Sequence, residues 1–102
     1  MIIRMERSGG FAGMTLRAEI DSEQLDERER LALQGLVKTA DFFNLPAHIE
    51  GPNVGADRFM YVISVEQGGI SHTVDVSEGG MPEELQPLVN RITLLARRYP
   101  KQ

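Results

Sequence analysis

Apolar residues alternate with polar ones along two separate ranges of the chain, and a helical apolar stripe follows each range. The alternation runs through residues 1–20 and again through residues 59–76. A period of two places every second side chain on one face of a sheet, so each range predicts a half-buried β-hairpin. The stripes, at residues 33–40 and 85–99, have the spacing of amphipathic helices. The sequence therefore predicts an α+β fold of order ββαββα, with a four-stranded, mainly antiparallel sheet and both helices packed on one face.

The first helix has two candidate starts that fit the capping rules about equally well. Asp21 can cap a helix with Gln24 in the reciprocal capping-box position, and Asp26 can do the same with Glu29. The helix is expected to end before Pro46, because proline disfavours the helical conformation in the residue that precedes it.

The segment that leaves this helix carries two adjacent aromatic residues. Phe42 and Phe43 cannot both point the same way, so one is expected to enter the core and the other to cover its edge. Asn44 can adopt the left-handed conformation that often ends a helix. Residues 44–57 contain two prolines and two glycines, and they are predicted to form an irregular loop that returns the chain along the helix.

The last helix is expected to open at Pro82, because proline suits a first helical position. Pro87 is then expected to interrupt one early hydrogen bond and to distort the first turn. Pro100 is expected to stop the helix.

The chain is long enough to bury a core without covalent cross-links. It has 102 residues, 41% of them hydrophobic, and no cysteine. We therefore expect one domain spanning residues 1–102, without disulfides, thiolate zinc sites or cysteine nucleophiles. The net charge of −4 argues against nucleic acid as a partner, since phosphate binding needs a basic face. The N-terminus has the pattern of neither a signal peptide nor a membrane span, so a cytoplasmic protein that binds no membrane is expected.

Residue types that carry catalysis are sparse. The two histidines, His48 and His72, are too few and too far apart in sequence to predict a metal site. Ser8, His72 and Asp75 could be written as a catalytic triad, but no nucleophile-elbow pattern supports that assignment. We expect no catalytic residues, no metal site and no cofactor, and the sequence is more typical of a binding protein.

The stretch Arg7-Ser8-Gly9-Gly10-Phe11-Ala12-Gly13 places three glycines and one large aromatic residue at the turn of the first hairpin. Glycine costs more backbone entropy than other residues, so a chain accepts it where φ must be positive or where another backbone comes close. Two interpretations stay open: Phe11 folds back onto the core, or it contacts a partner. Arg7 has two candidate acidic partners, Asp41 and Asp57.

Four blocks of sequence form a specific combination. They are Glu6-Arg7-Ser8-Gly9-Gly10-Phe11-Ala12-Gly13; Leu36-Val37 followed by Ala40-Asp41-Phe42-Phe43 and Leu45-Pro46; Asp57-Arg58-Phe59-x-Tyr61; and His72-Thr73-Val74. Together they resemble the emfourin family, and the similarity extends from residue 1 to about residue 95. The Arg-Ser-Gly-Gly-Phe block with Ala-Asp-Phe-Phe downstream is the specific part, whereas the strand and helix patterns fit many α+β domains.

This resemblance implies a function. Emfourin-like proteins are small bacterial proteins that inhibit thermolysin-like zinc metalloproteases such as protealysin. The cleft of such a protease binds extended peptide and favours a bulky apolar side chain just beyond the scissile bond, so a rigid loop that presents Phe11 can enter it. The resemblance implies an inhibitor that is not an enzyme. Because the chain has no cysteine and its two histidines are not expected to form a pair, we expect it to block the cleft without removing the zinc, and contact of a carboxylate or backbone carbonyl with the metal stays open. As a separate hypothesis, the protease-binding residues are Arg7, Ser8, Gly9, Gly10, Phe11, Ala12 and Gly13, with Asp57 and Arg58 beside them.

The alternative interpretation is a non-inhibitory interaction module. Met60 and Val62 lie on the more apolar outer face of the second hairpin, where they could form a homodimer contact. As an inhibitor, the protein needs no self-association and is expected to be a monomer.

Overall fold

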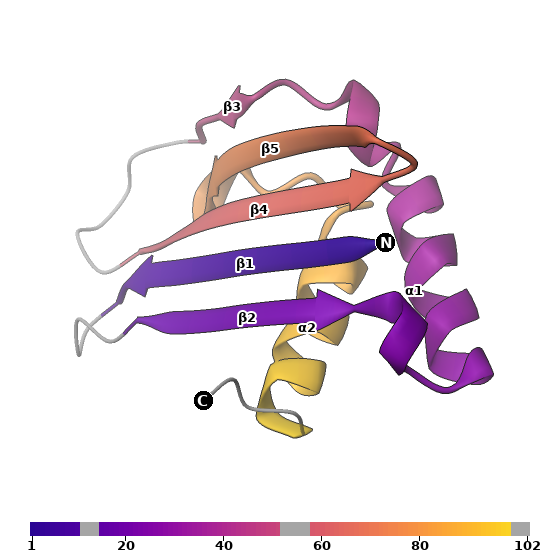
Figure 1. The fold of residues 1–102 in the computed structure, drawn as a ribbon. Helices are drawn as coiled ribbons and strands as arrows, with labels where there is room; N and C mark the ends of the chain where they lie inside the picture. The colour runs from indigo at the N-terminus through magenta and orange to yellow at the C-terminus, as the bar shows by residue number, and fades with distance from the viewer. Residues whose placement is uncertain (11–14, 52–57, 99–102) are drawn as a thin grey trace.

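The computed structural model describes residues 1–10, 15–51 and 58–98 of the chain. Phe11, Ala12, Gly13 and Asp57 lie outside these residues. Figure 1 shows the arrangement of the strands, short 3-10 helices and α-helices, which are β1 (Ile2–Gly9), β2 (Leu16–Asp21), η1 (Ser22–Gln24), α1 (Glu27–Thr39), η2 (Phe42–Asn44), β3 (His48–Ile49), β4 (Phe59–Gln67), β5 (Ile70–Ser77), η3 (Glu78–Gly80) and α2 (Gln86–Arg98).

The described strands form one mixed sheet in the order β2-β1-β4-β5-β3. The two predicted hairpins are present, and β1 and β4 pair antiparallel at the centre of the sheet. The predicted four-stranded sheet is wrong in one detail, because β3 pairs parallel with β5 and makes a fifth strand. The backbone N–H of Asp75 donates to the carbonyl of Ala47 at 2.9 Å and extends this pairing. A two-residue strand is too short to show alternation, so the range 44–57 carried no signal for it.

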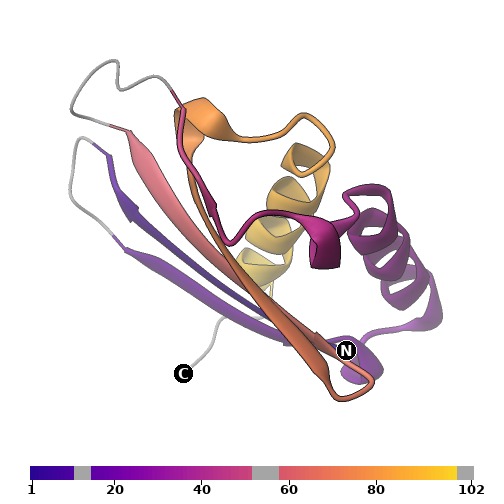
Figure 2. The ribbon, with the colours of Figure 1, turned by 90° about the horizontal axis from the view of Figure 1, so that it is seen from above.

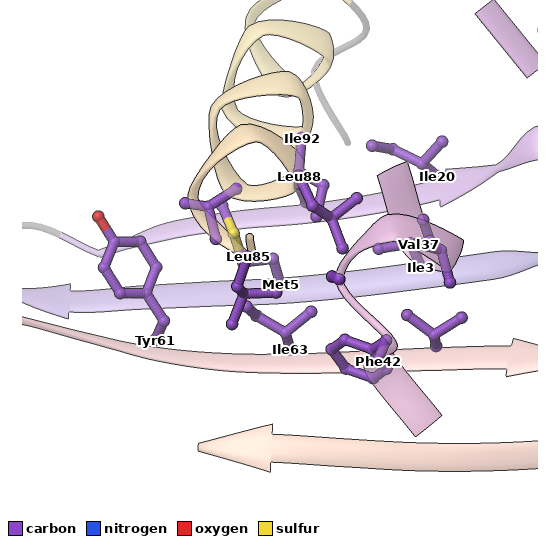
Figure 3. Packing of buried hydrophobic residues seen from close by; sticks show 14 of the residues in the cluster. Ile3, Met5, Ile20, Val37, Phe42, Tyr61, Ile63, Leu85, Leu88 and Ile92 are labelled. Atoms are coloured by element: carbon purple, nitrogen blue, oxygen red, sulfur yellow. The ribbon is translucent and has the colours of Figure 1, made fainter. Parts of the chain in front are cut away.

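Both α-helices cover one face of the sheet, as predicted (Figure 2). Side chains of β1, β2, β4 and β5 that point to this face pack against the apolar stripes of α1 and α2 (Figure 3). Burying such side chains supplies the main stabilising free energy of a domain of this size. The buried apolar residues are Ile3, Met5, Ala18, Ile20, Leu33, Val37, Ala40, Phe42, Tyr61, Ile63, Val65, Val74, Val76, Leu85, Leu88, Val89, Ile92, Leu95 and Ala96.

Both candidate caps before the first helix are used, but for different elements. Asp26 is the N-cap of α1, and its carboxylate accepts a hydrogen bond from the N–H of Glu29 at 2.8 Å. Asp21 caps the short η1 helix by accepting from the N–H of Glu23 at 3.0 Å. The α-helix therefore begins at the later of the two predicted positions.

Two predicted details at the helix ends are wrong. The left-handed residue after α1 is Asp41, with φ of 50°, and the amide of Asn44 donates to its carboxylate at 2.8 Å. The helix α2 begins at Gln86 instead of Pro82, because residues 83–85 form a preceding turn. The predicted distortion is present: the Pro82 carbonyl accepts from the N–H groups of Leu85 at 3.0 Å and Gln86 at 3.3 Å, but Pro87 has no N–H to continue this turn, so the regular helix begins after it.

Phe42 and Phe43 differ in burial, so substituting each of them tests how the core is packed. Phe42 is 1% exposed, whereas Phe43 is only partly buried. We expect Phe42→Ala to lower the free energy of unfolding by about 3–5 kcal/mol, since a large cavity remains. Phe43→Ala serves as the matched control and should cost less than half as much. Urea unfolding of both variants measures this difference, and a larger loss for Phe43→Ala would contradict the packing described.

Candidate functional site

Three segments of the chain meet at one end of the sheet. The last residue of β1, Gly9, lies opposite Phe59 at the start of β4. The N–H of Gly10 donates to the carbonyl of Arg58 at 3.4 Å. The N–H of Phe59 donates to the carboxylate of Glu78, in η3, at 3.1 Å. We call this region the glycine end of the sheet, and the ranges 11–14 and 52–57 adjoin it in the chain (Figure 1).

Arg7 lies against aromatic side chains at the glycine end. Its guanidinium carbon is 4.5 Å from the centre of the Phe59 ring, which is a cation–π geometry. Its charge also acts on the phenol of Tyr61, the residue opposite it on β4. Its Nε is buried and has no hydrogen-bond partner among the described residues. The Arg7 cation therefore lies over the face of the Phe59 ring and close to the phenol of Tyr61.

Of the two acidic partners suggested for Arg7, one is excluded by position. Asp41 accepts from Asn44 and lines a hollow with Gln67, which is the far end of β4 from Phe59. The pairing of Arg7 with Asp41 was therefore wrong, because the two residues lie at opposite ends of the sheet. The second suggested partner, Asp57, lies outside the described residues.

Tyr61 lies beside Phe59 and contributes an edge-on ring contact, with centroids 6.4 Å apart. It is 7% exposed. Burial raises the pKa of Tyr61 above its ordinary value of 10, against the lowering effects of the Arg7 charge and hydrogen bond, while Glu78 adds to the increase. Its phenol is therefore neutral at physiological pH and available to Arg7 as a hydrogen-bond partner.

The glycines of this end accommodate close approach within the chain itself. Gly9 and Gly10 have φ of +92° and +78°. A Cβ on Gly9 would lie 2.6 Å from the carbonyl oxygen of Arg58, and one on Gly10 would lie 2.5 Å from the Phe59 ring. Both positions therefore require glycine for two reasons: φ is positive, and there is no room for a Cβ. The segment that packs closely against Gly9 and Gly10 is therefore Arg58 and the start of β4.

A second close approach lies at the same end of the molecule. A Cβ on Gly51 would lie 2.3 Å from backbone atoms of Gly79 and Gly80, so the two backbones cross in contact. The N–H of Gly51 donates to the hydroxyl of Ser77 at 3.1 Å, which holds the crossing in place. The residues on both sides of the range 52–57 are thus anchored, Gly51 to β5 and Arg58 to Gly10.

The structure brings four of the nine predicted site residues together at the glycine end: Arg7, Gly9, Gly10 and Arg58. Ser8 lies opposite Met60 on β4. Strand alternation places it on the open face of the sheet, away from the Arg7 side chain. Phe11, Ala12, Gly13 and Asp57 lie outside the described residues, so their roles stay predictions.

Sequence reasoning missed three residues of this end. Phe59 and Tyr61 were predicted only as strand residues, but the Phe59 ring also faces the Arg7 guanidinium, and the Arg7 charge acts on the Tyr61 phenol. Arg7 continues the inward alternation of Ile3 and Met5, and that signal could have placed it beside the inward residues of β4. Glu78 carried no signal, because a single exposed glutamate after a strand fits any loop.

Elsewhere, the open face of the sheet carries a hollow of about 500 Å³. Two cross-strand ion pairs line it, Arg4 with Glu19 at 2.7 Å and Arg17 with Glu6 at 3.2 Å. Across the described parts of the chain, no three metal-ligating side chains come together as a metal site would require. Among these residues, too, no helix is long and apolar enough to span a membrane.

Comparison with known families supports the assignment suggested by the motifs. The emfourin family model matches residues 5–93, which is most of the chain. The chain belongs to the emfourin family. The emfourin match includes the first hairpin from Met5 onward, the second hairpin and the whole glycine end, from Arg7 to Gly80. Comparisons with curated proteins and with solved structures find no match.

Alanine substitutions at two glycines with the same backbone conformation separate the cost of backbone strain from the cost of a steric clash. Gly10 has φ of +78° and touches Phe59, whereas Gly69, in the β4–β5 turn, has φ of +80° and open space around it. Substitution by alanine costs about 1–2 kcal/mol at either position for the left-handed conformation. We expect Gly10→Ala to destabilise the protein by about 1–3 kcal/mol more than Gly69→Ala, because of overpacking. Equal losses in chemical denaturation would contradict the close packing of Gly10 on Phe59.

The raised pKa of Tyr61 has a measurable consequence at alkaline pH. The folded state holds the phenolic proton more tightly than the unfolded state does, so stability should fall as pH rises from about 10 through the folded-state pKa. In the variant Tyr99→Phe, Tyr61 is the remaining tyrosine of the two. We expect its phenolate absorbance to appear with a midpoint above 10. A midpoint at or below 10 would show that the ring is not desolvated.

Proposed function

We propose that this protein is an inhibitor of a thermolysin-like zinc metalloprotease and that its glycine end enters the active-site cleft. Membership of the emfourin family carries the proposal. The geometry of the glycine end supports it, because Gly10 and Arg58, which adjoin the ranges 11–14 and 52–57 in the chain, lie side by side at one end of the sheet.

Preorganisation favours tight binding at this end. A loop that is fixed before binding loses little conformational entropy when it enters a cleft. Here Gly9 and Gly10, which precede the range 11–14, contact β4 and Arg58. Gly51 and Arg58, which flank the range 52–57, are held by Ser77 and Gly10. The ranges 11–14 and 52–57, which lie outside the described residues, carry most of the remaining predicted contact residues, Phe11 among them.

The described side chains favour a steric block over extraction of the zinc. The two histidines lie apart on the structure and are engaged: His48 Nδ1 is 3.1 Å from Asp75, and His72 Nε2 is 2.7 Å from the carbonyl oxygen of Leu45. The chain has no cysteine, and no three potential metal ligands cluster among the described residues, which argues against a competing zinc site in that part of the chain. The proposed inhibitor therefore occludes the cleft and leaves the metal bound to the protease.

The proposal is tested by titrating the purified protein into thermolysin while hydrolysis of a small peptide is followed. We expect inhibition that saturates at a fixed molar ratio and persists when zinc is added. Activity that returns on addition of zinc would contradict steric occlusion. The absence of inhibition of thermolysin and of a thermolysin-like protease from the same genome would contradict the proposed function.

Phe11→Ala then tests the place of contact. If Phe11 enters the cleft, its loss should raise the inhibition constant on the order of thirtyfold or more, as for other buried interface aromatics, without changing the melting temperature. Ile70→Ala is the matched control, because Ile70 is 63% exposed at the start of β5, next to the turn at the other end of the sheet. Wild-type inhibition by Phe11→Ala, or a lowered melting temperature with inhibition retained, would place Phe11 outside the interface.

A further inference from the structure

Arg7 stands where the alternation of β1 calls for an apolar side chain. Ile3 and Met5 precede it on the same face of the strand and are 0% and 2% exposed (Figure 3). Its neighbours across the sheet are Leu16 on β2 and Tyr61 on β4. A third apolar residue would complete this row, so an arginine at the end of the row needs a separate explanation.

The inner part of the Arg7 side chain is withdrawn from water. Its Nε is buried and has no hydrogen-bond partner among the described residues. The Phe59 ring, whose centre lies 4.5 Å from the guanidinium carbon, attracts the charge through its face. A buried N–H group without an acceptor nevertheless costs free energy, and so does a charge that leaves water. The free protein therefore carries a cost at Arg7, and the attraction of the Phe59 ring acts against it.

Other arginines of the same sheet are paired with carboxylates. Arg4 Nε lies 2.7 Å from Glu19, and Arg17 Nε lies 3.2 Å from Glu6, both on the open face. Arg7 points to the opposite face and forms no ion pair with any residue that the structure describes. Water solvates an exposed cation, whereas a partly buried one depends on a counter-charge. The arginine that most needs a carboxylate is thus the one that the described chain leaves without one.

The groups around Arg7 do not supply this charge. The Tyr61 phenol is neutral at physiological pH, because burial raises its pKa. The carboxylate of Glu78 accepts a hydrogen bond from the N–H of Phe59 at 3.1 Å. Arg7 as a whole is only partly buried, so the outer part of its side chain reaches the surface of the glycine end. A partner that covers this end can therefore provide the counter-charge.

We infer that Arg7 binds a carboxylate of the protease, an aspartate or glutamate side chain beside the active-site cleft. The inference rests on the proposed function and names the chemical group that the glycine end recognises. A guanidinium is a planar fork of N–H donors that matches the two oxygens of a carboxylate. Because Nε is buried, the two terminal nitrogens are the ones that face the partner. The Phe59 ring packs against Gly10 and lies under the guanidinium, so the cation is oriented before binding.

Arg7→Met separates binding from folding. Methionine continues the apolar row and removes the partly buried charge, so the melting temperature should equal or exceed that of the wild type. The inhibition constant against thermolysin, or against the thermolysin-like protease that the wild type inhibits, should rise on the order of thirtyfold or more. The rise should come mainly from faster dissociation, since the protease carboxylate is left without its partner.

Two further substitutions identify the group that Arg7 meets. Arg7→Gln keeps N–H donors without the charge, and it should lose as much inhibition as Arg7→Met if the acceptor is a carboxylate. Arg7→Lys keeps the charge without the planar fork, so its inhibition constant should lie between those of the wild type and Arg7→Met. Added salt should weaken the wild type more than Arg7→Met, because salt screens the attraction that only the wild type has.

Arg4→Met is the matched control. It removes one positive charge from the same strand, but on the open face of the sheet, where the Arg4 side chain is 54% exposed. Exposed ion pairs contribute little to stability, so both the melting temperature and the inhibition constant should stay near the wild-type values.

Each contrary result has its own meaning. Wild-type inhibition by Arg7→Met or by Arg7→Gln would overturn the inference and leave the proposed function standing. A lowered melting temperature in Arg7→Met, with a loss of inhibition that Arg7→Lys shares fully and that salt does not change, would give Arg7 a structural role instead. Failure of the wild type to inhibit either protease would overturn the proposed function and this inference with it.

Discussion

The contact of Gly10 and Arg7 with the ring of Phe59 holds the glycine end together. The ring fills the space that a Cβ on Gly10 would occupy, and the Arg7 guanidinium lies 4.5 Å from its centre. These partners are about fifty residues apart in sequence, so the contact exists only when β1 and β4 pair at the centre of the sheet. The core packing of the strands against α1 and α2 thus sets the positions of Gly10, Arg7 and Phe59, and any partner of this end meets described residues that are already fixed by folding.

The parts of the fold that depend on local patterns were predictable. Alternation of Ile3 and Met5 with charged neighbours, and the same pattern around Ile63, assigned both hairpins and their buried faces. The stripes of α1 and α2 assigned both helices to one face of the sheet. In each case, a period of two or of 3.6 reports burial through residues that are close in sequence. The motif around Gly9 and Gly10 also indicated the family, and the family match confirms that indication.

Features that depend on pairing between distant residues were not predictable. The strand His48–Ile49 has no period of its own and exists because β5 accepts it as a neighbour. Either Phe42 or Phe43 could have entered the core, and only the turn at Asp41 decides between them. The same holds at the glycine end, where three glycines indicated a close approach but not that the approaching group is Phe59.

Hydrogen exchange of the free and protease-bound protein tests most directly whether the glycine end is the binding surface. The account predicts that a thermolysin-like protease slows exchange at the backbone amides of Gly10, Arg58 and the two adjoining loops. The amides of the β4–β5 turn at Gly68 and Gly69, at the other end of the sheet, should exchange as in the free protein. Protection concentrated at that turn or along the open face, with the glycine end unchanged, would contradict the account.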